Sequence, residues 1–399
     1  MKPWYGRFRA LWRRLRLSKR IAIFVGLGVL LLSVSKTACY AFFRPSHLDR
    51  SHPAVREDLA ARRRYLIHAV TDLSSGKMPW YLPDQFKGEW LAVTYSMTAM
   101  ALVNLSRIYP DTVGESAQIL DQMAAAMETD DVTSFDRALW NEDPLSSLDG
   151  PHGHIGYLGH LAIVLVAKKY VNPASPNDQR LRSILLALHR RMLDSPWILA
   201  ETYPGQIFVA DNAVVVASLS LAQPLFPDVS LDISERWVRS IQRRYLDPDT
   251  GLMVFRVGTD GSVIEKSRGS GVAWSIFYLS YAHDSFARQQ YQQLRSTLLS
   301  QPFGLFHGIR EVPVGNDWQG DVDSGPVLFG LSPSATGFAI AGAVLTGDDD
   351  TTLHLLRTAE WAGTTVSTGQ GRRYLLAPLV GDAILLAMRT VTPWRQPVP

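Results

Sequence analysis

The sequence has a single cysteine, Cys39, among its 399 residues. One cysteine forms no intramolecular disulfide and builds no cysteine-based zinc site, and Cys39 precedes the main body of the chain, which therefore has no thiol nucleophile. Charged residues are also sparse, at 19% of the sequence against 46% apolar residues. A chain of this length and composition can bury a large core, which excludes an intrinsically disordered protein.

Basic residues are concentrated at the start of the chain. Residues 1–20 carry eight Lys and Arg side chains and no acidic one, although the net charge of the whole sequence is only +3. The remainder is therefore acidic, which argues against a nucleic-acid partner. The basic segment predicts a cytoplasmic tail over residues 1–20, because the positive flank of a membrane span stays on the cytoplasmic side.

An apolar run follows the tail, beginning with Ile21–Leu32 and continuing to Phe43. About 23 residues in a helix can cross the hydrocarbon core of a membrane. The sequence predicts a single-pass inner-membrane anchor over 21–43, a polar linker interrupted by proline over 44–54, and a periplasmic body over 55–399. A cleaved signal peptide is the alternative, because the strictly apolar run is only about 14 residues long.

The body shows almost none of the apolar–polar alternation of strands, apart from short pieces near Gly251–Val257. Apolar residues recur at helical spacing, which predicts about twelve helices: 55–73, 88–109, 113–128, 156–171, 177–194, 211–222, 231–245, 270–282, 284–301, 332–344, 350–361 and 380–390. Nearly uncharged helices alternate with helices that carry a charged face. Because a helix that is apolar on all sides is buried and an amphipathic one covers it, we predict an all-α fold, an (α/α)6 toroid.

Five long loops, over 129–155, 195–210, 246–269, 302–331 and 362–379, enter the uncharged helices. Long loops in a compact domain are usually functional, and these are expected to meet at one end of the toroid. The predicted catalytic residues are Asp143, His160, Asp211, Asp321 and Asp323. The predicted substrate-binding residues are Tyr95, Trp140, His154, Tyr157, Thr202, Tyr203, Gln206, Arg268, Trp274, Trp318 and Tyr374.

Carboxylates beside Trp and Tyr rings are typical of carbohydrate-active enzymes. A carboxylic acid with a raised pKa, facing an ionised carboxylate, can cleave a glycosidic bond. The alternative for an acid such as Asp211 or Asp323 is to cap a helix or order a loop. Gly269-Ser270-Gly271 lacks the lysine of a phosphate-binding loop, and we expect it to let Arg268 and a helix N-terminus approach a ligand.

Neither a cofactor nor a metal is predicted. His152, His154 and His160 with an aspartate are an alternative zinc site, but short His-x-His spacings arise by chance. The segment Asp321–Asp323 lacks the glycine-centred pattern of a calcium loop. At the head of an apolar helix, His160 is either a hydrogen-bonded core residue or part of the site.

Three segments resemble the linalool dehydratase/isomerase family in order and spacing: Tyr157–Leu161, Phe208–Leu221 and Tyr245–Gly251. The similarity extends over most of residues 85–390 and implies an (α/α) barrel with cofactor-free addition and removal of water on a small terpene alcohol. It matches Tyr95 and His160 to polar residues of the family's active site. Thr202 and Asp211 stand where that family has two cysteines, and its catalytic aspartate corresponds to Asp72 or Asp84.

The replacement of the thiol pair makes linalool a poor candidate substrate and puts a new carboxylate, Asp211, at the same point. The leading hypothesis is a cofactor-independent hydrolase or lyase that cleaves a cell-envelope or exported glycan. One alternative is a hydro-lyase or isomerase acting on a small terpenoid-type alcohol. The other is a non-catalytic glycan-binding or envelope-assembly protein. The sequence leaves the oligomeric state open.

Overall fold

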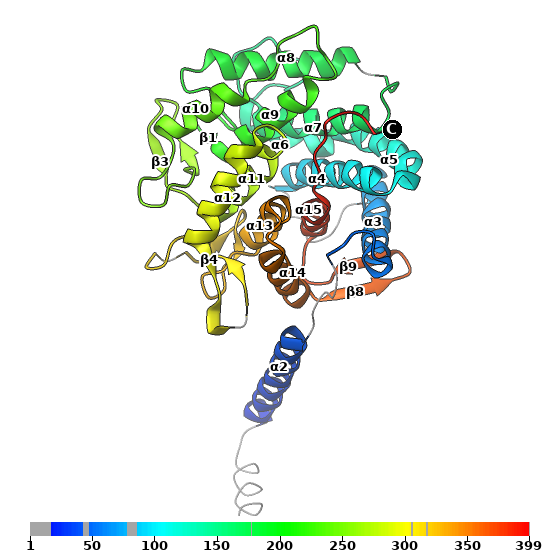
Figure 1. Cartoon of the computed structure of the whole chain (residues 1–399), viewed down its shortest axis with the longest axis vertical. Coiled ribbons are helices and arrows are strands. Elements are labelled where there is room, and N and C mark those ends of the chain that lie inside the picture. The colour runs from blue at the N-terminus through cyan, green and yellow to red at the C-terminus, as the bar shows by residue number, and fades with distance from the viewer. Residues whose placement is uncertain are drawn as a thin grey trace, which may run out of the picture. The chain divides into compact units, whose positions relative to one another are not determined.

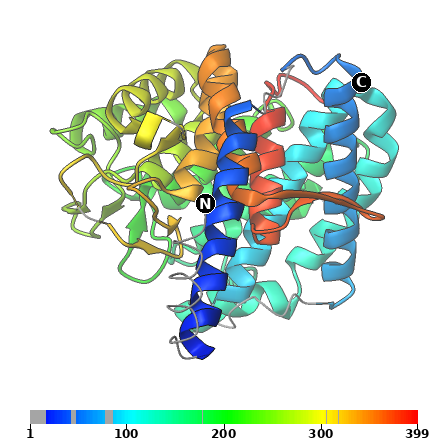
Figure 2. The same ribbon diagram turned by 90° about the horizontal axis from the view of Figure 1, so that it is seen from below.

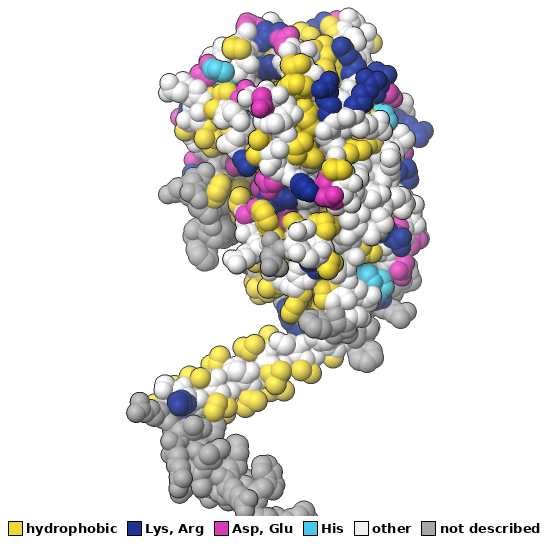
Figure 3. Space-filling view, turned by 90° about the vertical axis from the view of Figure 1, so that its left-hand side faces the viewer, with side chains coloured by type: hydrophobic (Ala, Val, Ile, Leu, Met, Phe, Trp, Pro, Cys, Tyr) yellow, Lys and Arg dark blue, Asp and Glu magenta, His cyan; other side chains and the backbone are white. Residues whose placement is uncertain are grey.

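The computed structural model describes residues 17–42, 48–77, 86–176, 178–304, 306–316 and 318–398. The chain divides into two compact units, 1–45 and 46–399. In the first, helix α2 spans Leu17–Phe42, and its segment Leu17–Ala38 is apolar, unburied and long enough to cross a membrane. Apolar side chains cover the visible face of this helix (Figure 3). The helix could therefore be a membrane anchor or a signal sequence, while most of the predicted tail and part of the linker lie outside the described residues.

The described part of the second unit contains two layers of six long helices each (Figure 1). The inner helices are α4 (Lys87–Ile108), α7 (Ile155–Val171), α9 (Val209–Ala222), α11 (Gly269–Leu279), α13 (Pro333–Thr346) and α15 (Leu379–Thr390). The outer helices are α3 (Pro53–Ser74), α5 (Val113–Met127), α8 (Asp178–Asp194), α10 (Ser234–Arg244), α12 (Asp284–Leu298) and α14 (Asp349–Gly363). Each inner helix packs against the next and α15 packs against α4, which closes the ring. The predicted (α/α)6 toroid is confirmed.

Residue type decides the layer that a helix joins. Every residue of α7 is buried, and even Lys168 lies inside, where its amine pairs with Asp121 at 2.8 Å. By contrast, α10 buries Trp237, Val238 and Ile241 at three-to-four spacing and exposes its charged side chains. An amphipathic helix of this kind covers a helix that is apolar all round.

One helix and most of the short strands in the described residues were not predicted. Helix α6 (Asp130–Trp140) lies inside the first long loop, where no helix was predicted. A three-stranded antiparallel sheet joins β1 (Ile207–Phe208), β2 (Arg256–Val257) and β3 (Val263–Glu265). The two-stranded pairs are β4 (Leu299–Ser300) with β5 (Gly308–Ile309), β6 (Gly320–Asp321) with β7 (Gly325–Pro326), and β8 (Thr365–Thr368) with β9 (Gly371–Tyr374). The pairing of β1 with β2 joins the loop over 195–210 to the loop over 246–269.

A buried ion-pair network joins α3 to α14, α15 and the β8–β9 hairpin, which lies across α3 (Figure 2). Arg62, with only 5% of its side chain exposed, pairs with Asp58 at 3.1 Å and with Glu360 at 2.6 Å. Asp58 also accepts from Arg372 at 2.7 Å and lies 2.9 Å from Arg389. Burial opposes ionisation of Asp58, but the charges of Arg389 and Arg62 hold its pKa well below the usual range.

We expect Asp58→Asn to lower the free energy of unfolding by about 3 kcal/mol at pH 7, because Arg62, Arg372 and Arg389 lose the carboxylate that they share. The folded-state pKa is depressed, so this stabilisation is present above the unfolded-state pKa of about 4 and is lost as the pH falls below it. Denaturant unfolding of both proteins at pH 7 and at lower pH measures the difference. Asp111→Asn is the matched control, since its pair with Arg56 is exposed. Equal losses in the two variants at pH 7 would contradict the prediction.

Candidate functional site

The N-terminal ends of the inner helices meet at one end of the toroid, because each inner helix is followed by an outer helix that runs back. At this end several inner-helix side chains are only half-buried: Glu89 and Val93 in α4, Asp211 in α9, Trp274 in α11 and Leu385 in α15. The deeper positions of the same helices are almost all buried. Solvent therefore reaches the inner helices from the end where the long loops lie.

Three carboxylates from three elements lie close enough to influence one another's charge at this end. Glu89 is in the first turn of α4, Asp211 is in the first turn of α9, and Asp323 is in the turn between β6 and β7. The hydroxyl of Tyr203 donates to Glu89 Oε1 at 2.7 Å, and the hydroxyl of Thr202 donates to Asp211. The predicted residues Asp211, Asp323, Thr202 and Tyr203 are thus brought together.

The pKa values of these three carboxyls are higher than those of exposed carboxyls. Burial and the charge of Glu89 raise the pKa of Asp211 to about 7, against the hydrogen bond from Thr202. Burial raises the pKa of Glu89, against the hydrogen bond from Tyr203. Burial and the negative charge of Asp321 raise the pKa of Asp323 to about 6, although 48% of its side chain is exposed. A helix N-terminus stabilises a carboxylate, so desolvation at Glu89, and desolvation with the charge of Glu89 at Asp211, exceed the effect of the helix dipole.

Glu89 is the acid that the sequence analysis missed. A signal was present: Glu89 is the third residue of α4, as Asp211 is the third residue of α9, so both inner helices place an acid at the same position. Of the two aspartates offered by the family resemblance, Asp72 pairs with Lys77 at 2.8 Å in an exposed position. Asp84 lies outside the described residues.

A column of aromatic side chains in edge-to-face contact, continued by Arg268, connects three of the long loops beside the carboxylates. The ring of Phe208 contacts that of Tyr203 at 6.1 Å and that of Phe255 at 5.4 Å between centroids. The guanidinium of Arg268 then lies between the rings of Phe255, at 4.2 Å, and Trp318, at 4.5 Å. Gln206 closes the turn from Tyr203 to Phe208 by backbone pairing with Tyr203. This column fixes the loops at the mouth relative to one another.

Arg268, predicted to bind substrate, and Asp321, predicted to be catalytic, both have partners within the protein. Arg268 is buried and its guanidinium lies 2.7 Å from Glu311 and 2.8 Å from Asp321. Asp321 Oδ1 in turn accepts from the backbone N–H of Asp323 at 3.1 Å. Both side chains therefore hold Asp323 in place. Gly269 serves packing rather than ligand approach, because a Cβ there would lie 2.1 Å from the carbonyl oxygen of Arg310.

His160 and Tyr95 form a deeper layer. His160 is buried, its Nδ1 lies 2.7 Å from Ser96 Oγ, and its ring meets that of Trp274 edge-on at 5.7 Å. Burial lowers the pKa of His160 to about 3, so the imidazole is neutral near pH 7. Tyr95 is 1% exposed, with its hydroxyl 3.5 Å from Ser74 Oγ. These contacts fit the hydrogen-bonded core alternative for His160.

Three further predicted site residues are engaged elsewhere. Tyr157 is fully buried and donates to the carbonyl oxygen of Met127 in α5 at 3.0 Å. Tyr374 donates to Glu360 in the ion-pair network at 2.9 Å. Asp143 accepts at 2.9 Å from the backbone N–H groups of the two loop residues 145 and 146, so it orders a turn. The contacts shown for these three residues are structural ones, and their roles in the site stay predictions.

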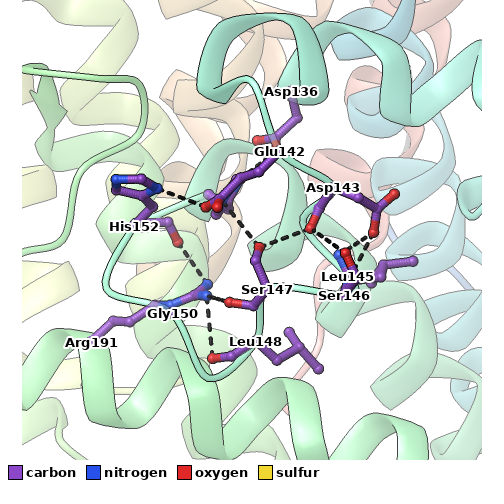
Figure 4. A network of polar contacts seen from close by, with 12 residues as sticks. Asp136, Glu142, Asp143, Leu145, Ser146, Ser147, Leu148, Gly150, His152 and Arg191 are labelled. Atoms are coloured by element: carbon purple, nitrogen blue, oxygen red, sulfur yellow. Dashed lines mark hydrogen bonds and ion pairs between the residues drawn. The ribbon is translucent and has the colours of Figure 1, made fainter.

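Trp140 and His154 belong to a second polar cluster, in the loop between α6 and α7. His154 Nδ1 lies 2.5 Å from Asp136 and its Nε2 lies 2.8 Å from Glu142. His152 Nδ1 lies 2.7 Å from the same oxygen of Glu142, as Figure 4 shows from close by. Trp140 stacks on His152 with centroids 5.1 Å apart and meets His154 at a tilted angle with centroids 4.8 Å apart. Trp140 and His154, predicted to bind substrate, thus make these contacts within the cluster.

No protein-family model and no curated protein matches the chain. Solved structures with a similar fold do exist. A selenomethionine derivative of the GH76 alpha-mannanase from Bacteroides thetaiotaomicron shares 13% identity with a TM-score of 0.47, over 84% of this chain and 95% of the other. A UGL variant with dGlcA-Glc-Rha-Glc shares 12% at 0.48, over 84% and 95%. A family 105 glycoside hydrolase from C. acetobutylicum ATCC 824 shares 10% at 0.49, over 82% and 98%.

The similarity concerns the arrangement of helices. At 10–13% identity it does not assign a reaction to this chain. The fold implied by the resemblance to the linalool dehydratase/isomerase family agrees with the toroid, whereas membership of that family stays a prediction.

Proposed function

We propose that the protein hydrolyses a glycan by acid–base catalysis at Asp211, Glu89 and Asp323. The observation that carries the proposal is the presence of two half-buried acids, Asp211 and Glu89, in the first turns of two inner helices, where burial and the charge of Glu89 raise the pKa of Asp211 to about 7. Two adjacent like charges do not readily ionise together, so one carboxyl keeps its proton near neutral pH. We assign the proton to Asp211 as general acid, and the role of base or nucleophile to Glu89, which Tyr203 orients.

The surroundings of the carboxylates favour a sugar substrate. The rings of Tyr203, Phe208 and Trp318 are half-buried beside them, and such rings can pack on the apolar faces of pyranoses. Asp323, in the turn between β6 and β7, has 48% of its side chain exposed and can meet a hydroxyl group or a water molecule. A polar, partly open site of this kind supports a glycan over a wholly apolar ligand.

Hydrolysis fits these residues better than elimination. A lyase that removes a proton next to a carboxylate needs a positive charge to stabilise the resulting anion. Within the described residues, the cations beside the cluster are already paired: Arg268 with Glu311 and Asp321, and Arg256 with Glu265 at 3.7 Å. The carboxylates, in contrast, supply the acid and the base that hydrolysis requires.

We extend the proposal to the location of the enzyme. With α2 as an uncleaved anchor, the basic residues before it would stay in the cytoplasm and the toroid would face the periplasm. The substrate would then be a cell-envelope or exported glycan.

One observation supports a second candidate function. Thr202 and Asp211, which stand where the resembled family has its two cysteines, are hydrogen-bonded to each other. A paired hydroxyl and carboxyl above the neutral imidazole of His160 could add or remove water on a small terpenoid-type alcohol.

An activity screen separates the two candidates. The full-length protein, purified in detergent, is incubated with oligosaccharides from envelope and exported polysaccharides and, in parallel, with terpene alcohols. We expect new reducing ends that carry oxygen-18 when the reaction is run in labelled water. Turnover of a terpene alcohol with no cleavage of any oligosaccharide would replace the hydrolase by the hydro-lyase.

Tyr203→Phe tests the orientation of Glu89. Loss of the hydrogen bond to Glu89 Oε1 should lower kcat roughly tenfold, the order of a charge-assisted hydrogen bond. The pKa of Glu89 should rise further, so the acidic limb of the pH–kcat profile should move to higher pH. Tyr157→Phe is the control, because its hydroxyl bonds to the backbone of α5. An unchanged acidic limb in Tyr203→Phe would remove this role.

A further inference from the structure

The loop between α6 and α7 brings three metal-ligand atoms together. Glu142 Oε1 lies 2.7 Å from His152 Nδ1 and 2.8 Å from His154 Nε2, and the ligand atoms of the three residues lie within 4.8 Å of one another. Figure 4 shows Glu142 and His152 pointing toward each other across the loop. Two imidazoles and one carboxylate are a ligand set that zinc favours.

A fourth residue gives independent support. Asp136 is fully buried, and its Oδ1 lies 2.5 Å from His154 Nδ1, while its Oδ2 has no hydrogen-bond partner among the described residues. A neutral imidazole has one N–H, which cannot serve Asp136 and Glu142 at the same time. If Nδ1 donates to Asp136, the lone pair of Nε2 faces the carboxylate of Glu142. A cation between His154 Nε2 and Glu142 Oε1 would replace this repulsive contact by two metal–ligand bonds. A carboxylate that accepts from the other ring nitrogen, as Asp136 does here, is usual for metal-binding histidines.

We propose that Glu142, His152 and His154 bind one divalent metal ion of the zinc class, with Asp136 as the positioning residue for His154. This site differs from the alternative considered from the sequence, because His160 bonds to Ser96 and the carboxylate comes from Glu142.

The geometry can accommodate the ion. Metal–ligand bonds of about 2.0–2.1 Å in a tetrahedral site require ligand atoms about 3.3 Å apart. The two separations from Glu142 Oε1 must therefore open by about half an ångström. His152 and Glu142 can move, since 48% and 33% of their side chains are exposed, whereas His154 and Asp136 are fully buried and supply the fixed half of the site. The exposed side leaves a fourth position for water.

The location indicates a structural metal. A Cβ on Gly153, between the two histidines, would lie 1.9 Å from the carbonyl oxygen of Glu201, so this loop packs directly on the loop that leads to Thr202. Arg191 holds the same loop by donating to the carbonyl oxygens of Gly153 at 3.1 Å and Ser147 at 2.8 Å. Bound metal would fix the first loop against the second. The inference does not depend on the proposed hydrolase.

Metal titration tests the site. The full-length protein without an affinity tag, purified in detergent and stripped with a chelator, is titrated with Zn²⁺ by calorimetry and with Co²⁺ by visible absorption. We expect one ion per chain, a Co²⁺ spectrum of a four-coordinate site and a higher Tm with Zn²⁺. Glu142→Gln and His152→Ala should each weaken binding at least about 100-fold, and Asp136→Asn about 10- to 100-fold. His68→Ala, exposed on α3, should bind as the wild type does.

Circular dichroism is measured before titration to check that each variant is folded. We expect the variants at Glu142 and His152 to fold, because both side chains are partly exposed. Binding of Zn²⁺ by Glu142→Gln and His152→Ala with wild-type affinity would place the metal elsewhere. The absence of stoichiometric binding to the wild type would mean that the cluster is a hydrogen-bond network around a cationic His154. Either result overturns the proposal.

Discussion

Replacing Asp211 by Asn is expected to lower kcat/KM on the cleaved glycan roughly 10³-fold, the order expected for loss of a general acid. The amide cannot donate a proton to the leaving oxygen. The same change should raise Tm, because it removes a carboxyl that is held among other acids in a poorly solvated position. Opposite effects on activity and stability would identify Asp211 as a residue kept for function.

The pH dependence gives a second measurement on the same variant. Wild-type kcat/KM should fall as the pH rises through about 7, where Asp211 loses its proton, and it should fall at low pH as Glu89 gains one. The folded-state pKa of Asp211 lies above its unfolded value of about 4, so its contribution to stability is full below that value and decreases as the pH rises toward 7. The Tm advantage of Asp211→Asn should therefore grow between pH 4 and 7.

Asp143→Asn is the matched control for this prediction. Asp143 lies in another of the long loops, but its carboxylate accepts two backbone hydrogen bonds within a turn. We expect its kcat/KM to stay within about twofold of the wild type, since surface turns away from the reacting atoms tolerate such changes. Retention of more than a tenth of the activity by Asp211→Asn, or an equal loss in Asp143→Asn, would contradict the assignment of the acid.

The toroid was predictable because the burial of a helix determines how apolar and charged residues are spaced along its sequence. Uncharged segments such as 270–282 became inner helices and segments with a charged face became outer ones. Helix α6 was missed because the segment 129–155 around it is rich in Asp, Ser, Pro and Gly, which are typical of loops. The short strands were missed for another reason: pairs of two residues, such as Gly320–Asp321 with Gly325–Pro326, are too short to show an alternating pattern.

The candidate site was only partly predictable, because its acids are defined by partners distant in sequence. Asp211 could be selected from the sequence because it follows a long loop. Glu89 is recognised as a site residue only through its hydrogen bond from Tyr203, which is 114 residues away. Arg268 and Asp321 looked available for substrate, yet they pair with each other across 53 residues. The two histidines of the second cluster are recognisable in the sequence as His-x-His. Their shared partner Glu142 and the buried Asp136 can be identified as partners only in the structure.

Replacing Arg268 by Met should have the largest effect on stability. Glu311 is fully buried, and its remaining partners are the backbone N–H of Ser270 at 3.2 Å and the hydroxyl of the same residue at 2.5 Å. An uncompensated buried charge costs about 3–5 kcal/mol, which we expect as the loss in the free energy of unfolding. Asp321 would also lose its cation, so the turn that holds Asp323 should loosen and kcat should fall.

Denaturant unfolding separates this effect from a general loss of a surface charge. Arg288→Met is the matched control, because Arg288 pairs with Asp284 on the exposed face of α12, where an ion pair contributes less than about 1 kcal/mol. The double variant Arg268→Met/Glu311→Met also lacks the buried carboxylate of Glu311. It should therefore regain about half of the free energy of unfolding that Arg268→Met loses. Activity should not return with it, because the contact from Arg268 to the Asp321 turn is still absent. A double variant as unstable as Arg268→Met would show that the stranded charge of Glu311 is not the cause.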